Sequence, residues 1–174
     1  MQPYLERMLR AAKLEARLYE EVEADSGAMK QAMGVVVLAS LAAGIGSAGR
    51  VGVTGMVMGT LAALAGWYIW AFLTYLIGTR LLPEPQTKTT HSELLRTIGF
   101  ASSPGLIRVL GLIPGLAAFV FPVAAIWMLI AMVIGVRQAL DYTSTLRAVG
   151  VCLIGWIIQI LFTMAIFALL SGRP

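Results

Sequence analysis

Charged side chains are scarce in this sequence and are absent from long stretches of it. Lysine, arginine, aspartate and glutamate make up 13% of the 174 residues, whereas 59% are hydrophobic. None of the four occurs among residues 55–77, and similar apolar runs recur along the chain. About 20 apolar residues in a helix cross a hydrocarbon core about 30 Å thick, so residues 55–77 alone are long enough to span a membrane. The sequence therefore predicts an integral membrane protein with several spans and little left over for a soluble domain.

Cysteine and histidine are nearly missing as well. Cys152 and His91 are each the only residue of their type, so the chain cannot form an internal disulfide. No cluster of cysteine, histidine and carboxylate residues has the spacing of a metal site. Cys152 lies in an apolar run, which favours a packing role. We expect no metal ion and no cofactor.

Sequence motifs of enzymes are also absent. The chain has no GxSxG, HExxH or P-loop, and no GxGxxG between a strand and a helix. Every aspartate and glutamate lies outside the apolar runs, which argues against a proton- or ion-coupled transporter. The net charge of +4 fits loop lysines and arginines that set membrane orientation. We expect neither an enzyme nor a nucleic-acid-binding protein.

The apolar runs and their breaks predict an all-α bundle of five transmembrane helices. The predicted spans are residues 29–46, 53–77, 98–112, 116–139 and 146–170. The polar connector, residues 79–97, is expected to lie in water. Gly111, Pro114 and Gly115 predict a tight turn between the third and fourth spans. Residues 28–174 are expected to form one transmembrane domain.

Residues 1–27 form a separate cytoplasmic segment in this prediction. Apolar residues recur at helical spacing from Tyr4 to Val22, with basic residues among them, which predicts an amphipathic interfacial helix. The second half of the segment is acidic. Two arrangements stay open: the helix lies in contact with lipid, or it packs against the protein's own cytoplasmic loops.

The distribution of lysine and arginine predicts the orientation in the membrane. With a cytoplasmic N-terminus, three of these residues lie outside, namely Arg50, Arg108 and Arg173. The ten inside are Arg7, Arg10, Lys13, Arg17, Lys30, Arg80, Lys88, Arg96, Arg137 and Arg147. Because cytoplasmic loops carry the excess of positive charge, we expect a cytoplasmic N-terminus and an exterior C-terminus.

Small residues recur along one face of the second predicted span. Gly55, Gly59, Ala63 and Gly66 are spaced so that another helix backbone can approach closely. The partner helix is either internal or from another chain, and we favour internal packing.

The third predicted span holds the most unusual segment. Ser102, Ser103 and Pro104 lie within it, and proline frees a backbone carbonyl there, so a broken helix is expected. Arg108 follows, and a charge at membrane depth must snorkel, pair or line a wet cavity. It either reaches the outer head groups or belongs to a lipid or partner site. Gln159 in the fifth span either bonds a neighbouring helix or contributes to such a site.

Polar residues at the cytoplasmic end of the fourth span predict local structure. Arg137 and Asp141 are one helical turn apart, which favours an ion pair. Tyr142, Thr143 and Ser144 are expected to form the following turn and cap.

Four segments occur in a recognisable order. They are Tyr19-Glu-Glu-Val-Glu-Ala-Asp25, Gly99-Phe-Ala-Ser-Ser-Pro104, Gly111-Leu-Ile-Pro-Gly115, and Ile126-Trp-Met-Leu129 leading to Val136-Arg-Gln-Ala-Leu-Asp141. Together they resemble the prokaryotic branch of the Yip family of small membrane proteins, over about residues 14–170. The resemblance implies five spans, a cytoplasmic N-terminus and a short exposed C-terminus. Eukaryotic members are partners of Ypt/Rab GTPases, but this chain lacks their long N-terminal domain, so no GTPase partner is carried over.

Two functions are consistent with the sequence. The favoured one is a non-catalytic scaffold or accessory protein of the prokaryotic cytoplasmic membrane that binds lipids, other membrane proteins or a second copy of itself. The alternative is a lipid-handling or small-molecule permeation protein that uses the broken third helix. A cavity lined by Ser102, Ser103, Arg108 and Gln159 and open to lipid would indicate the second. A tightly packed bundle with an exposed small-residue face would indicate the first.

Overall fold

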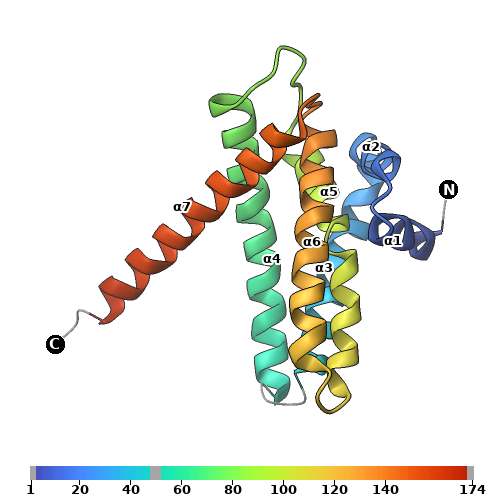
Figure 1. Ribbon diagram of the computed structural model, residues 1–174, viewed down its shortest axis with the longest axis vertical. Coiled ribbons are helices and arrows are strands. Elements are labelled where there is room, and N and C mark those ends of the chain that lie inside the picture. Colours follow the sequence, from blue (N-terminus) through green and yellow to red (C-terminus); the bar gives the residue numbers. More distant parts are fainter. Residues whose placement is uncertain (1–2, 48–51, 172–174) are drawn as a thin grey trace.

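All regular secondary structure is helical in the part of the chain that the structure describes, residues 3–47 and 52–171 of a computed structural model (Figure 1). No strand occurs in these residues, and the predicted all-α fold is confirmed. Arg50 and Arg173, two of the cations placed outside the membrane by the charge count, lie beyond the described residues.

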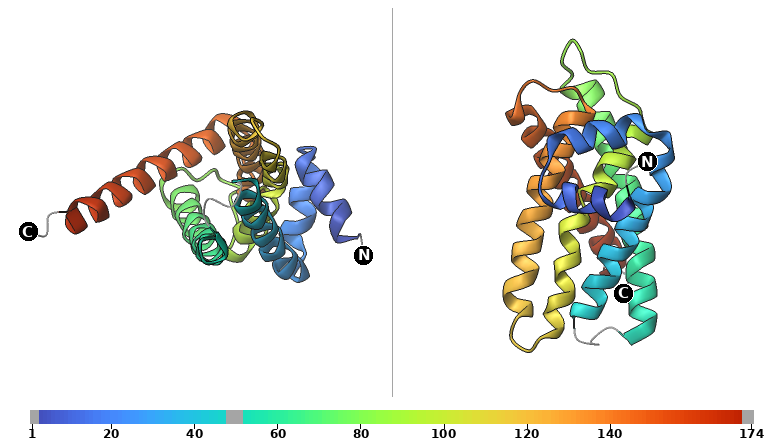
Figure 2. Two further views of the ribbon diagram at one scale, coloured as in Figure 1. Left: turned by 90° about the horizontal axis from the view of Figure 1, so that it is seen from below. Right: turned by 90° about the vertical axis from the view of Figure 1, so that its right-hand side faces the viewer.

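Three helices are long and apolar enough to cross a membrane, and they run side by side (Figures 1 and 2). They are α3, Met29–Gly46, preceded by the short 3₁₀ helix η1, Ser26–Ala28; α4, Gly52–Leu76, continued by the π-helical turn η2, Ile77–Leu81; and α6, Ala117–Ala139. Their bounds agree closely with the first, second and fourth predicted spans.

The third predicted span is part of a longer, broken rod. It consists of α5, His91–Phe100, and the 3₁₀ helix η3, Ser103–Leu112. A 3₁₀ helix rises about 2.0 Å per residue against about 1.5 Å in an α-helix, so the two ten-residue pieces together reach about 35 Å. The broken rod is therefore long enough to cross a hydrocarbon core of about 30 Å.

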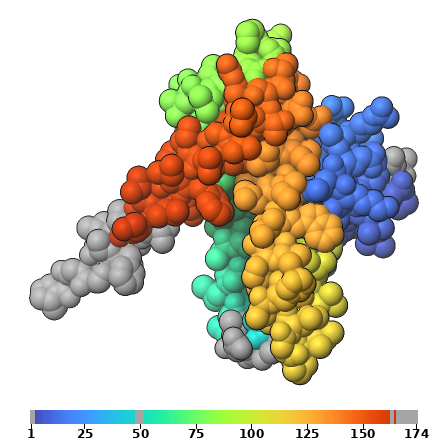
Figure 3. Space-filling model, in the orientation of Figure 1, coloured from blue at the N-terminus to red at the C-terminus, as the bar shows by residue number. Residues whose placement is uncertain are grey.

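The fifth predicted span corresponds to α7, Thr145–Ser171, which leaves the bundle at an angle (Figures 1 and 3). Its apolar stretch Thr145–Leu161 is shorter than the three full spans. A Cβ on Gly155 would lie 3.1 Å from the Trp70 ring, so α7 crosses α4 closely at this point. Because only α3, α4 and α6 have the length and composition of a span among the described residues, the count of five stays a prediction.

The polar connector is shorter than expected, because α5 begins inside it. Thr90 caps the helix, its hydroxyl accepting from the Glu93 amide while the Glu93 carboxylate accepts from the Thr90 amide at 2.7 Å. Residues 94–97 are buried, so placing them in water was wrong. Arg96 donates to the carbonyl oxygens of Val22 and Glu23, which lie in the last turn of an N-terminal helix and lack partners within that helix.

The N-terminal segment forms two helices instead of the single one expected. They are α1, Tyr4–Ala12, and α2, Ala16–Ala24, and the chain turns between them at Leu14, whose φ is 62°. The turn lets both helices bury an apolar face. The buried side chains of the two helices are Met8, Ala11, Leu18, Tyr19 and Val22. They form one core cluster with residues of the bundle, namely Ala28, Ala32, Val35, Phe100, Ala101 and Ala131.

Of the two arrangements left open for this segment, the structure shows packing against the protein itself, and contact with lipid stays a prediction. α1 and α2 pack on the side of the bundle, against helices and not against loops (Figure 2). The Trp127 indole donates to the Ala12 carbonyl oxygen at 2.7 Å. On the opposite face of α1, Leu5 and Leu9 remain 69% and 62% exposed.

Basic side chains of α1 are paired with carboxylates from the same segment. Arg10 donates to both Glu15 and Glu21 at 2.7–2.9 Å. Arg7 pairs with Asp25 at 2.8 Å. These pairs tie α1 to α2 and leave little net charge on this side of the bundle.

The closest helix packing uses small residues, but not those predicted. A Cβ on Gly99 would lie 2.8 Å from the Ala32 side chain, and one on Gly105 would lie 3.3 Å from Ala39. The close helix contact between small residues, which the sequence predicted for α4, therefore lies between α3 and the α5–η3 rod. No atom lies within 4 Å of a Cβ built on Gly59 or Gly66, so the expected internal packing is not present at these two glycines.

The end of the bundle at which α6 ends is held by backbone contacts and by the buried carboxylate of Glu84. Arg137 donates to the carbonyl oxygens of Tyr142 and Thr143, and no ion pair with Asp141 occurs among the described residues, so the predicted pair is wrong. Asp141 has a φ of 53°, which lets the chain reverse after α6. Glu84 accepts from both the amide and the hydroxyl of Thr143.

Candidate functional site

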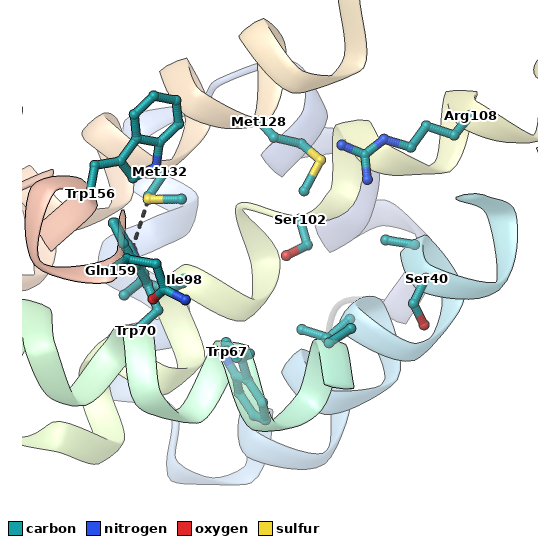
Figure 4. Close-up of a pocket in the computed structure, with 14 residues that line it drawn as sticks. Ser40, Trp67, Trp70, Ile98, Ser102, Arg108, Met128, Met132, Trp156 and Gln159 are labelled. Atoms are coloured by element: carbon teal, nitrogen blue, oxygen red, sulfur yellow. Dashed lines mark hydrogen bonds between the residues drawn. The ribbon is translucent and has the colours of Figure 1, made fainter. Parts of the chain in front are cut away.

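A cavity of about 390 Å³ lies between α4 and α6 (Figure 4). α3 and η3 border it near one end, and α7 borders the other. Its lining is mostly apolar or aromatic and includes small residues of α4. The lining residues are Val36, Ala39, Ser40, Ala63, Gly66, Trp67, Trp70, Ile98, Ser102, Arg108, Met128, Met132, Trp156 and Gln159.

The cavity brings together three of the five residues that the sequence proposed as a site. Ser102, Arg108 and Gln159 line it, from the helix break, η3 and α7. Ser103 and Pro104 do not line it; both are buried, and the Ser103 hydroxyl has no hydrogen-bond partner in the described chain. The turn residues Gly111, Pro114 and Gly115 line a different hollow, at the end of the bundle beside Phe121.

The helix break sets the direction of the polar residues. The Ala101 amide still bonds the Thr97 carbonyl four residues back, whereas the Ser102 and Gly105 amides bond carbonyls three residues back, at Gly99 and Ser102. Pro104 has no amide hydrogen to continue an α-helical ladder, which favours the tighter winding of η3. Ser102 and Arg108 consequently point into the same cavity from the two sides of Pro104 (Figure 4).

Arg108 is the only ionisable side chain among the described residues that line the cavity. Its guanidinium carbon lies 5.8 Å from the centre of the Phe121 ring, a cation–π distance. Its Nε atom is buried and has no hydrogen-bond acceptor within the described residues. A charge in such surroundings is costly unless an acceptor outside the protein reaches it.

Tryptophans and methionines of the cavity were not anticipated from the sequence. The Trp67 indole donates to the Leu95 carbonyl oxygen at 2.9 Å, and the Trp70 indole donates to the Met132 sulfur at 3.0 Å. Because their N–H groups are satisfied, these rings present apolar surface to the cavity. The sequence did carry one signal for these residues. Tryptophan is enriched at membrane interfaces, so tryptophans within a predicted span could have indicated a special role there.

Comparison with protein families identifies most of the chain. The family model described as Yip1 domain matches residues 19–167, which contain every residue that lines the cavity. Curated proteins and solved structures give no match.

Proposed function

The chain belongs to the Yip1 domain family, and we propose that this membrane protein acts without catalysis, by holding a lipid in the cavity between α4 and α6. The observation that carries the proposal is the cavity itself. It offers a long apolar surface and one charged side chain near an end, and a lipid has the same division into apolar chain and polar head. Of the two functions left open by the sequence, this arrangement favours lipid handling.

A matched pair of variants on α4 tests this proposal. Gly66 lines the cavity and Gly59 does not, yet neither has an atom within 4 Å of a Cβ, so both positions have room for a larger side chain. Gly66→Leu should fill part of the cavity and lower the amount of co-purifying lipid severalfold, measured by native mass spectrometry in mild detergent. Gly59→Leu should retain the wild-type amount. Equal lipid in both variants would refute the cavity as a lipid site.

A second candidate function is favoured by the open small-residue face of α4. Gly59 is exposed, and with Gly55 it forms a GxxxG step that a transmembrane helix of another protein can approach closely. This supports a scaffold or accessory role with a membrane-protein partner, or self-association. The same variants then act in the opposite sense: Gly59→Leu should reduce the cross-linked complex with a partner or second copy, and Gly66→Leu should preserve it.

The cellular setting belongs to the proposal as well. We place the protein in a prokaryotic cytoplasmic membrane with a cytoplasmic N-terminus, on the basis of the charge distribution. In that orientation, the turn between η3 and α6 faces the exterior, and Arg108 lies nearer the outer leaflet than the inner one.

A further inference from the structure

The counter-charge for Arg108 does not come from the protein's own spans. All nine aspartates and glutamates lie outside residues 26–83, 94–140 and 142–174, which hold the helices around the cavity. Within the described chain, no hydrogen-bond acceptor contacts the Arg108 guanidinium, and its Nε atom is buried. Since no described residue supplies an anion to this side chain, a bound ligand is the source that fits it.

Arg108 is held where it is by its backbone and does not simply extend to the nearest surface. A Cβ on Gly46 would overlap the Arg108 carbonyl oxygen, so the backbones of α3 and η3 are in direct contact at this residue. Figure 4 shows the side chain extending from η3 toward Met128 and the interior of the cavity. A snorkelling arginine would instead carry its head group away from apolar surroundings.

A second hydrogen-bond donor lies in the same cavity. The Ser102 side chain lines it, and Figure 4 shows its hydroxyl directed into the cavity. A guanidinium and a hydroxyl that line the same space of low polarity favour an anion with several acceptor oxygens. A phosphate group has this geometry, because it accepts two parallel N–H bonds from arginine and a further bond from a hydroxyl.

We infer that Arg108 and Ser102 bind the phosphate group of an anionic phospholipid, whose acyl chain lies along Trp67, Trp70 and Met132 in the cavity. This inference rests on the proposed lipid-binding function and names the chemical class of the lipid. The apolar side chains extend from the serine and arginine toward α7 (Figure 4), so a head group at Arg108 leaves the rest of the cavity to the chain.

Binding of phosphatidylglycerol to the delipidated full-length protein tests the inference. Native mass spectrometry gives the affinity of the wild type, Arg108→Gln and Arg108→Lys, with phosphatidylcholine as a lipid that carries no net charge. Arg108→Gln should weaken phosphatidylglycerol binding about tenfold, the size expected for loss of a charge-assisted hydrogen-bonded contact. Arg108→Lys should weaken it less, because a point charge reproduces only part of the two-point geometry. Phosphatidylcholine binding should change little.

Control variants separate this inference from general electrostatics and from the cavity itself. Arg17→Gln removes one positive charge from an exposed position on α2 and should bind phosphatidylglycerol as the wild type does. If Gly66→Leu abolishes binding of both lipids while Arg108→Gln keeps wild-type affinity for phosphatidylglycerol, the cavity binds lipid and the phosphate inference is wrong. If Arg108→Gln lowers phosphatidylglycerol affinity while Gly66→Leu changes nothing, Arg108 contacts the lipid head group, and the placement of the acyl chain in the cavity is wrong.

Inorganic phosphate distinguishes a lipid head group from a free anion. The thermal unfolding midpoint of the wild type in neutral detergent should rise when phosphatidylglycerol is added and should not change with millimolar inorganic phosphate. A phosphate-dependent shift that Arg108→Gln removes would identify a free anion as the ligand and overturn the lipid assignment. Arg108→Gln should fold, because it removes a charge that has no acceptor in the protein.

Discussion

Gly46 of α3 and Arg108 of η3 are in backbone contact, and the carbonyl oxygen of Arg108 occupies the space that a Cβ on Gly46 would need. Gly111 completes the contact, since a Cβ there would lie 2.5 Å from the Gly46 carbonyl oxygen. Backbone atoms cannot turn aside as a flexible side chain can. The contact therefore fixes η3 against α3 and sets the place from which Arg108 enters the cavity.

Gly46→Ala should destabilise the protein by about 1–3 kcal/mol, the usual cost of forcing extra volume into a packed site. The measurement is the thermal unfolding midpoint in mild detergent. Gly59→Ala is the control, because Gly59 has open space around it. Similar midpoints for the two variants would show that α3 and η3 separate easily at Gly46.

Glu23, near the end of α2, should make the free energy of unfolding fall as pH rises. Burial, with the nearby carboxylates of Asp141, Glu93 and Glu20, raises its pKa from 4.5 to about 7, and Arg96 opposes the shift. Between these values the folded protein keeps a proton that the unfolded chain has released, so stabilisation present below about pH 4.5 is lost as pH rises through 7.

Glu23→Gln should remove this dependence and raise the unfolding midpoint at pH 8 relative to the wild type, with little difference at pH 4.5. Glu6→Gln removes the same charge from an exposed position of α1 and should not reproduce the effect. A difference between wild type and Glu23→Gln that stays constant from pH 4.5 to 8 would contradict the buried-carboxyl explanation.

Leu9 of α1 should contact lipid. It is 62% exposed, while the end of α1 is bonded to Trp127, which lies twelve residues, or about 18 Å, from the end of α6. The variant Leu9→Cys, made in a Cys152→Ala background, can carry a nitroxide spin label for electron paramagnetic resonance. Dissolved oxygen should relax this label strongly, and a water-soluble paramagnetic reagent should relax it weakly. Lys88→Cys in the connector is the water-exposed control, and equal accessibility of the two sites to the aqueous reagent would place α1 in water.

The charge distribution predicts which end of the bundle is cytoplasmic. In the Cys152→Ala background, a cysteine at Lys88 should be protected from an impermeant thiol reagent added to intact cells, because residues 79–97 are expected inside. A cysteine at Ile113, which is 54% exposed in the turn before α6, should be labelled. Labelling at Lys88 together with protection at Ile113 would reverse the orientation.

Much of the architecture could be predicted because it depends on local chemistry. The absence of charge from residues 55–77 requires a membrane helix, and Pro104 cannot continue an α-helical ladder, so the break in the third rod follows from its covalent structure. The faces of α4 and α6 could not be predicted in the same way. Both helices are apolar all round, so periodicity does not tell which side meets protein and which meets lipid.

The sequence by itself determined that this is an all-helical membrane protein, and it singled out Ser102, Arg108 and Gln159 as unusual polar residues within apolar runs. Only the tertiary structure decided that these three side chains share a cavity with Trp67 and other apolar residues. It also decided that the closest packing lies between α3 and the α5–η3 rod. The physical reason is that small residues permit close approach on any helix, whereas the partner is chosen by how all the helices fit together.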